Sequence, residues 1–361
     1  MRPMRIVKFE LLKFAKSAYC IVTLCIMLLG LVTPLVEYAV WKREIGGDEF
    51  LFRQKASEFE HQQIDLSVTK DDLDALIRQV TLGLTPEEKL DHAILLDRTK
   101  VAYRLHAWDI YFADTDNRQN RPDKYFNTPG IERIFSTSLG NYGVLVICLV
   151  ILILLNAPLY SSENANDMVD VIISRKHGRR DILRAKHLAS SILTFIMLSL
   201  FYWLTTIIYL TVFKDWGHLG IPAMNVTPGN ALPGIVFPTI SVGDLLSLGY
   251  LCFISSGLAL SGLLCMISNM QRNVIGSIGI SILAVYLPIV ASRLSFSWLF
   301  SLYPSISMQI MDLFGIFYFI ELFGYSIPQF VPVLVFNVLL YIISFIFTTT
   351  FSLFGKRGTC K

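Results

Sequence analysis

The chain has 361 residues, of which 53% are hydrophobic and only 16% are charged, and its mean hydropathy is +0.54. An ordinary globular domain carries about 25% charged residues, so this composition excludes a typical soluble protein and indicates a membrane protein. The formal net charge of +3 is too small to indicate a nucleic-acid partner.

The first 17 residues are basic, and a long apolar run follows them. Their cationic side chains are Arg2, Arg5, Lys8, Lys13 and Lys16. The run at 18–40 has no small-residue cleavage site at its end, which is typical of a retained span rather than a signal peptide. We therefore expect a cytoplasmic interfacial helix at 1–17 and the first transmembrane helix at 18–40.

Residues 41–137 form a polar insert that is expected to be an extracytoplasmic helical domain. Thr85, Pro86 and Glu88 match an N-cap, a proline at the first helical position and a capping-box glutamate. Apolar residues recur at helical spacing after them, which predicts a helix. A second helix is predicted to begin at Thr69, where two aspartates precede a one-sided apolar pattern.

Residues 138–361 contain five further apolar runs of about 20 residues, the length that a helix needs to cross a bilayer. They lie at 141–160, 188–213, 245–269, 274–292 and 331–354. Because the backbone must satisfy its own hydrogen bonds in lipid, these runs predict helices rather than a barrel. The predicted fold class is an all-α polytopic membrane protein with six transmembrane helices.

Lysine and arginine in the short segments predict the orientation of the spans. They gather in the first 17 residues, in the loop at 161–187 and at 356–361, whereas the opposite short loops contain only Lys214 and Arg293. Both termini and the loop at 161–187 are therefore expected in the cytoplasm. The expected location is a cell membrane, in a bacterium.

The segment at 294–330 is expected to form an outer hairpin. Its apolar part, 306–325, is long enough to be considered as a seventh span. However, it contains Asp312 and Glu321, and a carboxylate near the bilayer centre costs about 2.5–3.5 kcal/mol. We therefore expect a re-entrant or interfacial helical hairpin on the outer side.

The sequence contains no recognisable motif for catalysis, metal binding or ATP binding. The sequence has no CxxC pair, His/Cys cluster, HExxH or GxSxG motif, so we expect no metal, no structural disulfide and no enzyme activity. It also has no GxxxxGK[ST] phosphate loop. If ATP powers this protein, ATP and Mg must be bound by a partner ATPase, and no cofactor is expected in this chain.

The cytoplasmic loop at 161–187 contains the most informative residues. It reads as a short amphipathic helix, a turn at His177-Gly178 and the basic start of a new helix. Val171 and Ile172 share an apolar face, and Glu163 lies near the N-terminal end, where the helix dipole favours an anion. From these residues alone, we expect the loop to be a basic anchor that contacts anionic lipid headgroups.

The same segment resembles the coupling region of type-2 ABC permeases, the integral-membrane subunits of ATP-binding-cassette exporters. Glu163 matches a glutamate after the second span, residues 171–174 an aliphatic stretch, and Arg179 an arginine after the turn. Residues 182–186 match the Ile-Leu-x-x-Lys entry to the third span. Residues 9–13 resemble the interfacial elbow helix, and Pro304 the entry to an outer re-entrant hairpin.

The resemblance implies an exporter permease that moves an amphipathic or hydrophobic cargo, such as a peptide or lipid-like compound. The implied partners are ABC ATPase subunits, a second permease copy or paralogue, and membrane lipids. The residues implied in coupling to the ATPase are Glu163, Val171, Ile172, Arg175, Arg179, Arg180 and Lys186, together with Glu10 and Lys13 of the elbow helix. The alternative is a membrane-anchored sensor or scaffold whose outer domain binds a ligand.

Overall fold

The computed structural model describes residues 2–45, 49–60, 128–135, 142–165, 178–221, 223, 240–294, 302–309, 319–322 and 325–350, with isolated positions between 71 and 99. Within this part of the chain, six helices are long and apolar enough to cross a membrane. They are Ala18–Glu44, Val144–Ala165, Asp181–Val212, Val242–Met270, Val274–Ser292 and Phe330–Thr350. The predicted fold class is confirmed, and the chain is a multi-pass membrane protein.

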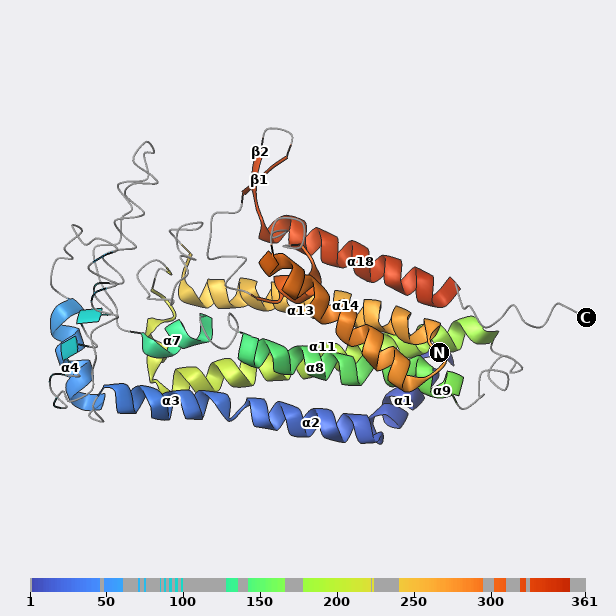
Figure 1. The fold of residues 1–361 in the computed structure, drawn as a ribbon, viewed down its shortest axis with the longest axis horizontal. Helices are drawn as coiled ribbons and strands as arrows, with labels where there is room; N and C mark the ends of the chain where they lie inside the picture. The colour runs from blue at the N-terminus through green and yellow to red at the C-terminus, as the bar shows by residue number, and fades with distance from the viewer. Residues whose placement is uncertain are drawn as a thin grey trace, which may run out of the picture.

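The helices run side by side along the long axis of the molecule (Figure 1). Their order begins with α1 (Arg2–Ala15), α2 (Ala18–Gly30), α3 (Thr33–Glu44), α4 (Glu49–Glu60) and α7 (Pro129–Arg133). It continues with α8 (Tyr142–Asn156), α9 (Pro158–Ala165), α11 (Gly178–Val212), the 3-10 helix η3 (Asp215–His218), α13 (Val242–Met270) and α14 (Val274–Leu294). The last elements are α16 (Pro304–Ser307), β1 (Phe319–Leu322), β2 (Tyr325–Pro328) and α18 (Phe330–Thr350).

Two ends of the bundle can be distinguished in Figure 1. The described start of the chain, α1, α9 and the beginning of α11 lie at one end, whereas α4 and α7 lie at the other. The basic residues predict that the first end faces the cytoplasm, and on that prediction we name the first end the cytoplasmic end and the second the outer end. These two names are used below.

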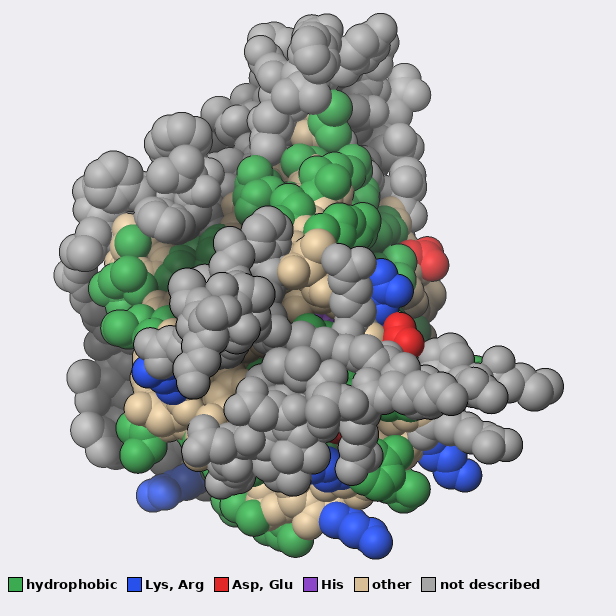
Figure 2. Space-filling model, turned by 90° about the vertical axis from the view of Figure 1, so that its right-hand side faces the viewer, with side chains coloured by type: hydrophobic (Ala, Val, Ile, Leu, Met, Phe, Trp, Pro, Cys, Tyr) green, Lys and Arg blue, Asp and Glu red, His purple; other side chains and the backbone are tan. Residues whose placement is uncertain are grey.

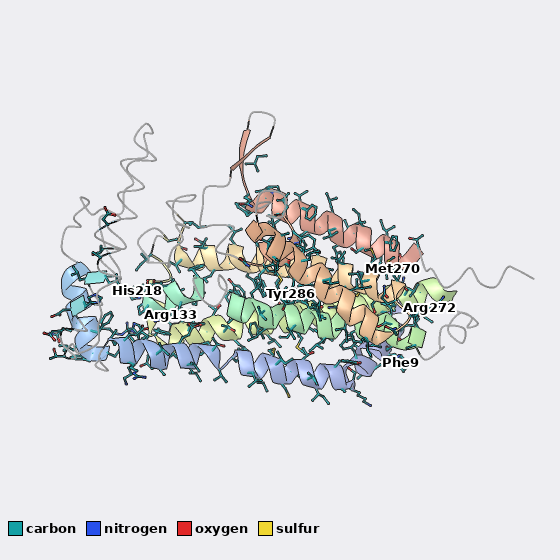
Figure 3. All side chains as sticks on the ribbon, viewed as in Figure 1. Phe9, Arg133, His218, Met270, Arg272 and Tyr286 are labelled. Atoms are coloured by element: carbon teal, nitrogen blue, oxygen red, sulfur yellow. The ribbon has the colours of Figure 1, made fainter. Side chains whose placement is uncertain are left out.

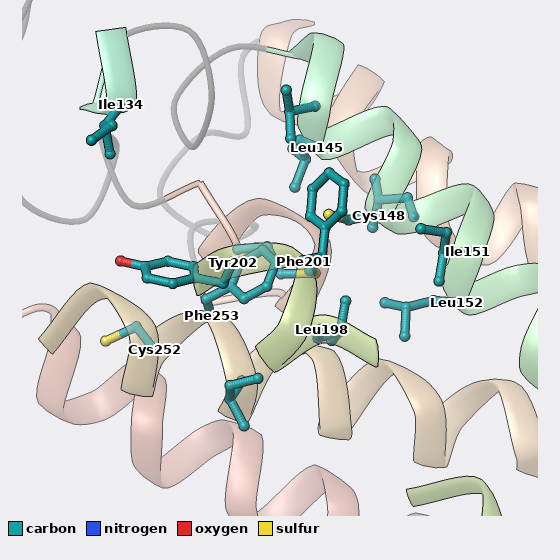
Figure 4. Close-up of a cluster of buried hydrophobic side chains, with 14 of the residues drawn as sticks. Ile134, Leu145, Cys148, Ile151, Leu152, Leu198, Phe201, Tyr202, Cys252 and Phe253 are labelled. Atoms are coloured by element: carbon teal, nitrogen blue, oxygen red, sulfur yellow. The ribbon is translucent and has the colours of Figure 1, made fainter. Parts of the chain in front are cut away.

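Aromatic side chains fill the middle of the bundle between α11 and α13. Phe201 and Tyr202 of α11 are buried beside Phe253 of α13 (Figure 4), and the Tyr202 hydroxyl donates to the Leu246 carbonyl at 2.7 Å. The first span approaches α11 closely at Gly30, where an added Cβ would lie 2.8 Å from the Phe201 ring. Close packing of the first span against α11 therefore depends on Gly30, which leaves room for the Phe201 ring.

The second span is interrupted at Pro158, which separates α8 from α9 and has no backbone N–H. The Ala157 carbonyl, directly before the proline, accepts hydrogen bonds of 2.6 Å from both Ser268 of α13 and Ser277 of α14. The Ser161 amide donates to the Ser268 hydroxyl at 3.1 Å. Serines of two neighbouring helices thus satisfy backbone groups around this break in the helix, as a membrane interior requires.

The outer hairpin differs from the predicted helical conformation. Its described residues form the short helix α16 and the antiparallel pair β1–β2, in which Phe319 faces Pro328 and Leu322 faces Tyr325. The strands Phe-Ile-Glu-Leu and Tyr-Ser-Ile-Pro contain aromatic and β-branched residues, which favour strands. Glu321 lies in β1, outside every candidate span, whereas Asp312 is outside the described residues.

Most described residues of the outer insert are helical. The capping box predicted at Thr85 is present: the Thr85 amide donates to Glu88 Oε2 at 2.7 Å, and the Glu88 amide donates to Thr85 Oγ1 at 3.3 Å. Asp71 and Ala75 are also helical, as expected for the helix predicted from Thr69. A loop is predicted from the sequence at 114–130. Residues 114–127 lie outside the described part of the chain, whereas Pro129 and Gly130 begin the short helix α7 and so differ from the prediction.

Candidate functional site

An ion network at the cytoplasmic end joins three helices through Glu163. Its Oε1 lies 2.6 Å from Lys13 Nζ on α1, and its Oε2 forms an ion pair with Lys186 on α11. Glu163 itself lies near the end of α9. One carboxylate therefore fastens the amphipathic N-terminal helix to the cytoplasmic ends of the second and third spans. We call Glu10, Lys13, Glu163 and Lys186 the inner charge cluster.

Lys186 is the most deeply buried member of the inner charge cluster. Only 1% of the residue is exposed, and its Nζ lies 5.5 Å from the centroid of the Tyr160 ring. The Tyr160 hydroxyl donates to the Leu183 carbonyl at 3.0 Å, which fixes the ring against α11. A buried ammonium is costly unless it is paired, and here both a carboxylate and an aromatic face stabilise it.

Glu10 provides a second carboxylate on the buried side of α1, one turn before Lys13. Burial raises the pKa of Glu10, although the positive charges of Lys186 and Lys13 oppose the shift. Burial also disfavours the charged form of Lys13, but its hydrogen bond and attraction to Glu163 prevail and raise the pKa of Lys13. Two carboxylates thus face two ammonium groups.

A further contact holds α9 at this end. The Asn164 side chain donates from Nδ2 to the Gln271 carbonyl at 2.8 Å, directly after α13. The position of Glu163 is therefore fixed from two sides, by the inner charge cluster and by the turn between α13 and α14. Figure 2 views the end of the bundle at which these elements meet, and blue lysine and arginine side chains are scattered around its rim.

The predicted coupling residues fall into three groups. Glu163, Lys186, Glu10 and Lys13 are brought together in the inner charge cluster. Arg179 and Arg180 lie in the first turn of α11, where the backbone alone is described, and Val171, Ile172 and Arg175 lie outside the described residues. Their role in coupling stays a prediction. Tyr160 and Asn164 were not among the predicted residues, because no spacing in the sequence indicates their contacts.

The third span is long enough to connect the inner charge cluster with the other end of the bundle. In 35 residues α11 spans about 50 Å, which exceeds the hydrocarbon thickness of about 30 Å, so one helix reaches from the inner charge cluster to the outer end. Among the described residues, no group of three or more His, Cys, Asp and Glu side chains could hold a metal. Glu163 of α9 is the residue that contacts both α1 and α11 in this cluster.

A second charged cluster lies at the outer end around Asp215, directly after α11. Asp215 is fully buried, and its Oδ2 accepts hydrogen bonds from the amides of Gly130 at 2.6 Å and Ile131 at 3.2 Å in α7. Burial raises the pKa of Asp215 to about 7, against the opposing effects of Arg53 and of these two amides. An added Cβ on Gly130 would lie 2.6 Å from Phe213 Cβ, so the close approach requires glycine.

Arg53 of α4 connects this carboxylate to the rest of the outer end. Its Nη1 lies 3.8 Å from Asp215 Oδ1, its Nε bonds Glu49 at 3.0 Å, and its Nη2 donates to the Phe213 carbonyl. Glu49 also binds Lys214 at 3.2 Å. Burial disfavours the Glu49 carboxylate, but its bonds to Tyr38, Arg53 and Lys214 prevail and lower the pKa of Glu49.

We call Glu49, Arg53, Gly130, Lys214 and Asp215 the outer clamp. It ties both described ends of the insert, α4 and α7, to the end of the third span. Figure 3 shows Arg133 and His218 near this end and Phe9, Met270 and Arg272 at the other. The outer clamp was not predicted from the sequence, since its members are separated by up to 166 residues.

Comparisons with known proteins add no identification. No family model matches the chain, and neither a curated protein nor a solved structure matches it.

Proposed function

We propose that this chain is the membrane-spanning permease subunit of an ABC exporter whose ATPase is a separate polypeptide. The observation that carries the proposal is the inner charge cluster. Glu163 and Lys186, two of the residues named by the resemblance to type-2 ABC permeases, form an ion pair, and Lys13 of the elbow-like helix completes it. This is the arrangement expected of a region that receives movement from a partner and passes it to the spans.

The division of roles within the cytoplasmic end follows from burial. Lys186 is too deeply buried to offer its ammonium to a partner, so its role in this proposal is to position Glu163 and α1. Arg179 and Arg180 at the start of α11, with the segment at 166–177, are then the groups that meet the ATPase. ATP and Mg are bound by that partner, because the sequence has no phosphate loop.

Six spans make half of a transporter in this proposal, so a second copy or a paralogue completes the pathway. Charge-poor spans favour an amphipathic or hydrophobic cargo, because moving a charge past them would be costly. The test is affinity purification from the native membrane with a tag after Lys361. A phosphate-loop ATPase that co-purifies, and whose ATP hydrolysis depends on this chain, supports the proposal; recovery of the chain without any such ATPase contradicts it.

A membrane-anchored sensor is the second candidate, and the outer clamp favours it. Asp215 and Arg53 couple the insert directly to the third span, so a ligand bound outside could move α11. The two proposals differ in what removal of the insert does. Deleting residues 61–127 abolishes the response of a sensor, whereas a permease keeps ATP hydrolysis by its partner.

A further inference from the structure

The N-terminal helix α1 has a face that the described part of the chain leaves uncovered. Met4 is 81% exposed, Phe9 64% and Leu12 52%. Lys8 and Lys16 are exposed as well. We call these five residues the outward face of α1. It combines three large apolar side chains with two cations.

Apolar and cationic residues alternate along the outward face. Met4, Lys8, Leu12 and Lys16 recur at intervals of four residues, and positions four apart lie on one side of a helix. The helical pattern extends to Lys16, whose amide donates to the Leu12 carbonyl at 3.2 Å. The two lysines are therefore set among the apolar side chains and not on a separate polar face.

The other side of α1 is held against the bundle. The helix packs on α11, and Glu10 is buried. Lys13, beside the outward face, reaches Glu163 at 2.6 Å. Glu10 is the only acidic residue of α1, so the outward face carries positive charge and no carboxylate.

The outward face lies at the depth where the first span begins. Helix α1 ends at Ala15, and α2 begins at Ala18 after Ser17, whose hydroxyl accepts from the Cys20 amide at 3.3 Å. Figure 3 shows Phe9 at this end of the bundle. Because two residues alone separate α1 from a helix that crosses the membrane, the outward face is confined to the boundary between hydrocarbon and headgroups.

This boundary accounts for the alternation of residue types. Water would leave three large apolar side chains hydrated, and hydrocarbon would make the lysines costly. At the boundary, the apolar side chains enter the acyl region while the lysines extend their ammonium groups to the phosphates.

We propose that the outward face of α1 binds anionic phospholipids in preference to zwitterionic ones. Met4, Phe9 and Leu12 insert among the acyl chains, and Lys8 and Lys16 pair with the headgroup phosphates. A zwitterionic headgroup carries its own cation, which opposes the attraction of a lysine, whereas phosphatidylglycerol has a net negative charge. Since α1 also contributes Lys13 to the inner charge cluster, one helix joins the bound lipid to that cluster.

The test places a photo-cross-linker on the outward face of the full chain. p-Benzoylphenylalanine replaces Phe9 or, as the matched control, Leu29 of α2, which is 70% exposed within the first span. Each protein is irradiated in nanodiscs with equal amounts of phosphatidylglycerol and phosphatidylcholine of the same acyl chains, and mass spectrometry compares the lipid adducts. A lysine near an anionic surface gives about a fivefold preference, so phosphatidylglycerol adducts should exceed phosphatidylcholine adducts about fivefold or more at position 9. They should be about equal at position 29.

A second variant assigns the preference to the two lysines. Lys8→Gln combined with Lys16→Gln, with the cross-linker at position 9, keeps both side chains exposed and should lower the adduct ratio about fivefold or more. Equal ratios at positions 9 and 29, a ratio that the glutamines leave unchanged, or cross-links to protein in place of lipid would each overturn the proposal. The readout involves no ATPase, so its outcome is independent of the proposed exporter function.

Discussion

The two ends of the bundle use charge in different ways. At the cytoplasmic end, Glu163 is shared between two lysines, one fully buried and one half-exposed. At the outer end, Asp215 is held mainly by backbone amides of α7, and its arginine lies 3.8 Å away. The inner charge cluster is therefore a set of side-chain ion pairs, whereas in the outer clamp a carboxylate accepts hydrogen bonds from backbone amides of α7.

Because their contacts differ, the two ends should differ in which substitutions and which pH changes weaken them. A lysine carries its charge on a flexible four-carbon stem, so its ion pair can tolerate small shifts of the helices. A carboxylate bound to backbone amides depends on one close approach, which glycine at 130 permits. We thus expect the inner charge cluster to be sensitive to charge, and the outer clamp to be sensitive to shape and pH.

The largest expected effect comes from Glu163→Gln. It leaves the Lys186 ammonium buried without its carboxylate, and breaking a buried pair costs about 3–5 kcal/mol of folding free energy. Denaturant unfolding in detergent measures the loss. Lys13→Met is the control, because 52% of the Lys13 side chain is exposed and such pairs contribute less than about 1 kcal/mol. Equal losses in both variants would mean that Glu163 does not serve mainly to neutralise Lys186.

Gly130→Ala should have the next largest effect. The new methyl group would lie 2.6 Å from Phe213 Cβ and 2.8 Å from Asp215 Oδ2, so α7 must move away from α11. Overpacking of this kind costs about 1–3 kcal/mol. Gly217→Ala is the matched control, since an added Cβ there meets nothing within 4 Å. Limited proteolysis of the insert should speed up in Gly130→Ala alone; unchanged proteolysis would argue that α7 is not held by this contact.

A smaller effect is expected from pH. The folded-state pKa of Asp215 is raised to about 7 from an ordinary 3.8, so the protonated form stabilises the fold. This contribution is fully present below pH 3.8 and is lost as pH rises through 7, with about 1.4 kcal/mol lost between pH 6 and pH 8. Melting curves at these two pH values measure it. Asp215→Asn should remove this part of the pH dependence, and an unchanged dependence in the variant would assign it to another group.

The spans and their order could be predicted from the sequence because hydrocarbon imposes its constraint locally. A run such as 274–292 is long enough and apolar enough by itself, and Thr85 with Glu88 defines a helix start within four residues. Contacts at long range left no such signal. The ion pair of Lys13 with Glu163 joins residues that are 150 positions apart. The two serines that donate hydrogen bonds to the Ala157 carbonyl, beside Pro158, come from two later helices.

The outer hairpin shows why an apolar segment can mislead. Hydropathy alone does not distinguish helix from strand in a short run, and Asp312 and Glu321 indicated only that 306–325 should not cross the membrane. The aromatic and β-branched residues of 319–328 favour the observed β1–β2 pair. Likewise, the sequence indicated that Lys186 belongs to the cytoplasmic region but not that Tyr160 and Glu163 bury it.

The central claim, that the cytoplasmic end docks a separate ATPase, is tested most directly by reversing one charge at the start of α11. Arg179→Glu and the matched control Arg43→Glu, an exposed arginine at the outer end of α3, are expressed with the candidate ATPase and purified through a tag on the permease. Close charge pairs at interfaces contribute about 1.5–7 kcal/mol, so Arg179→Glu should reduce ATPase recovery about tenfold or more at equal expression. Arg43→Glu should recover as much ATPase as wild type. Equal recovery with both variants would contradict the account and leave the loop as a basic anchor on the lipid surface.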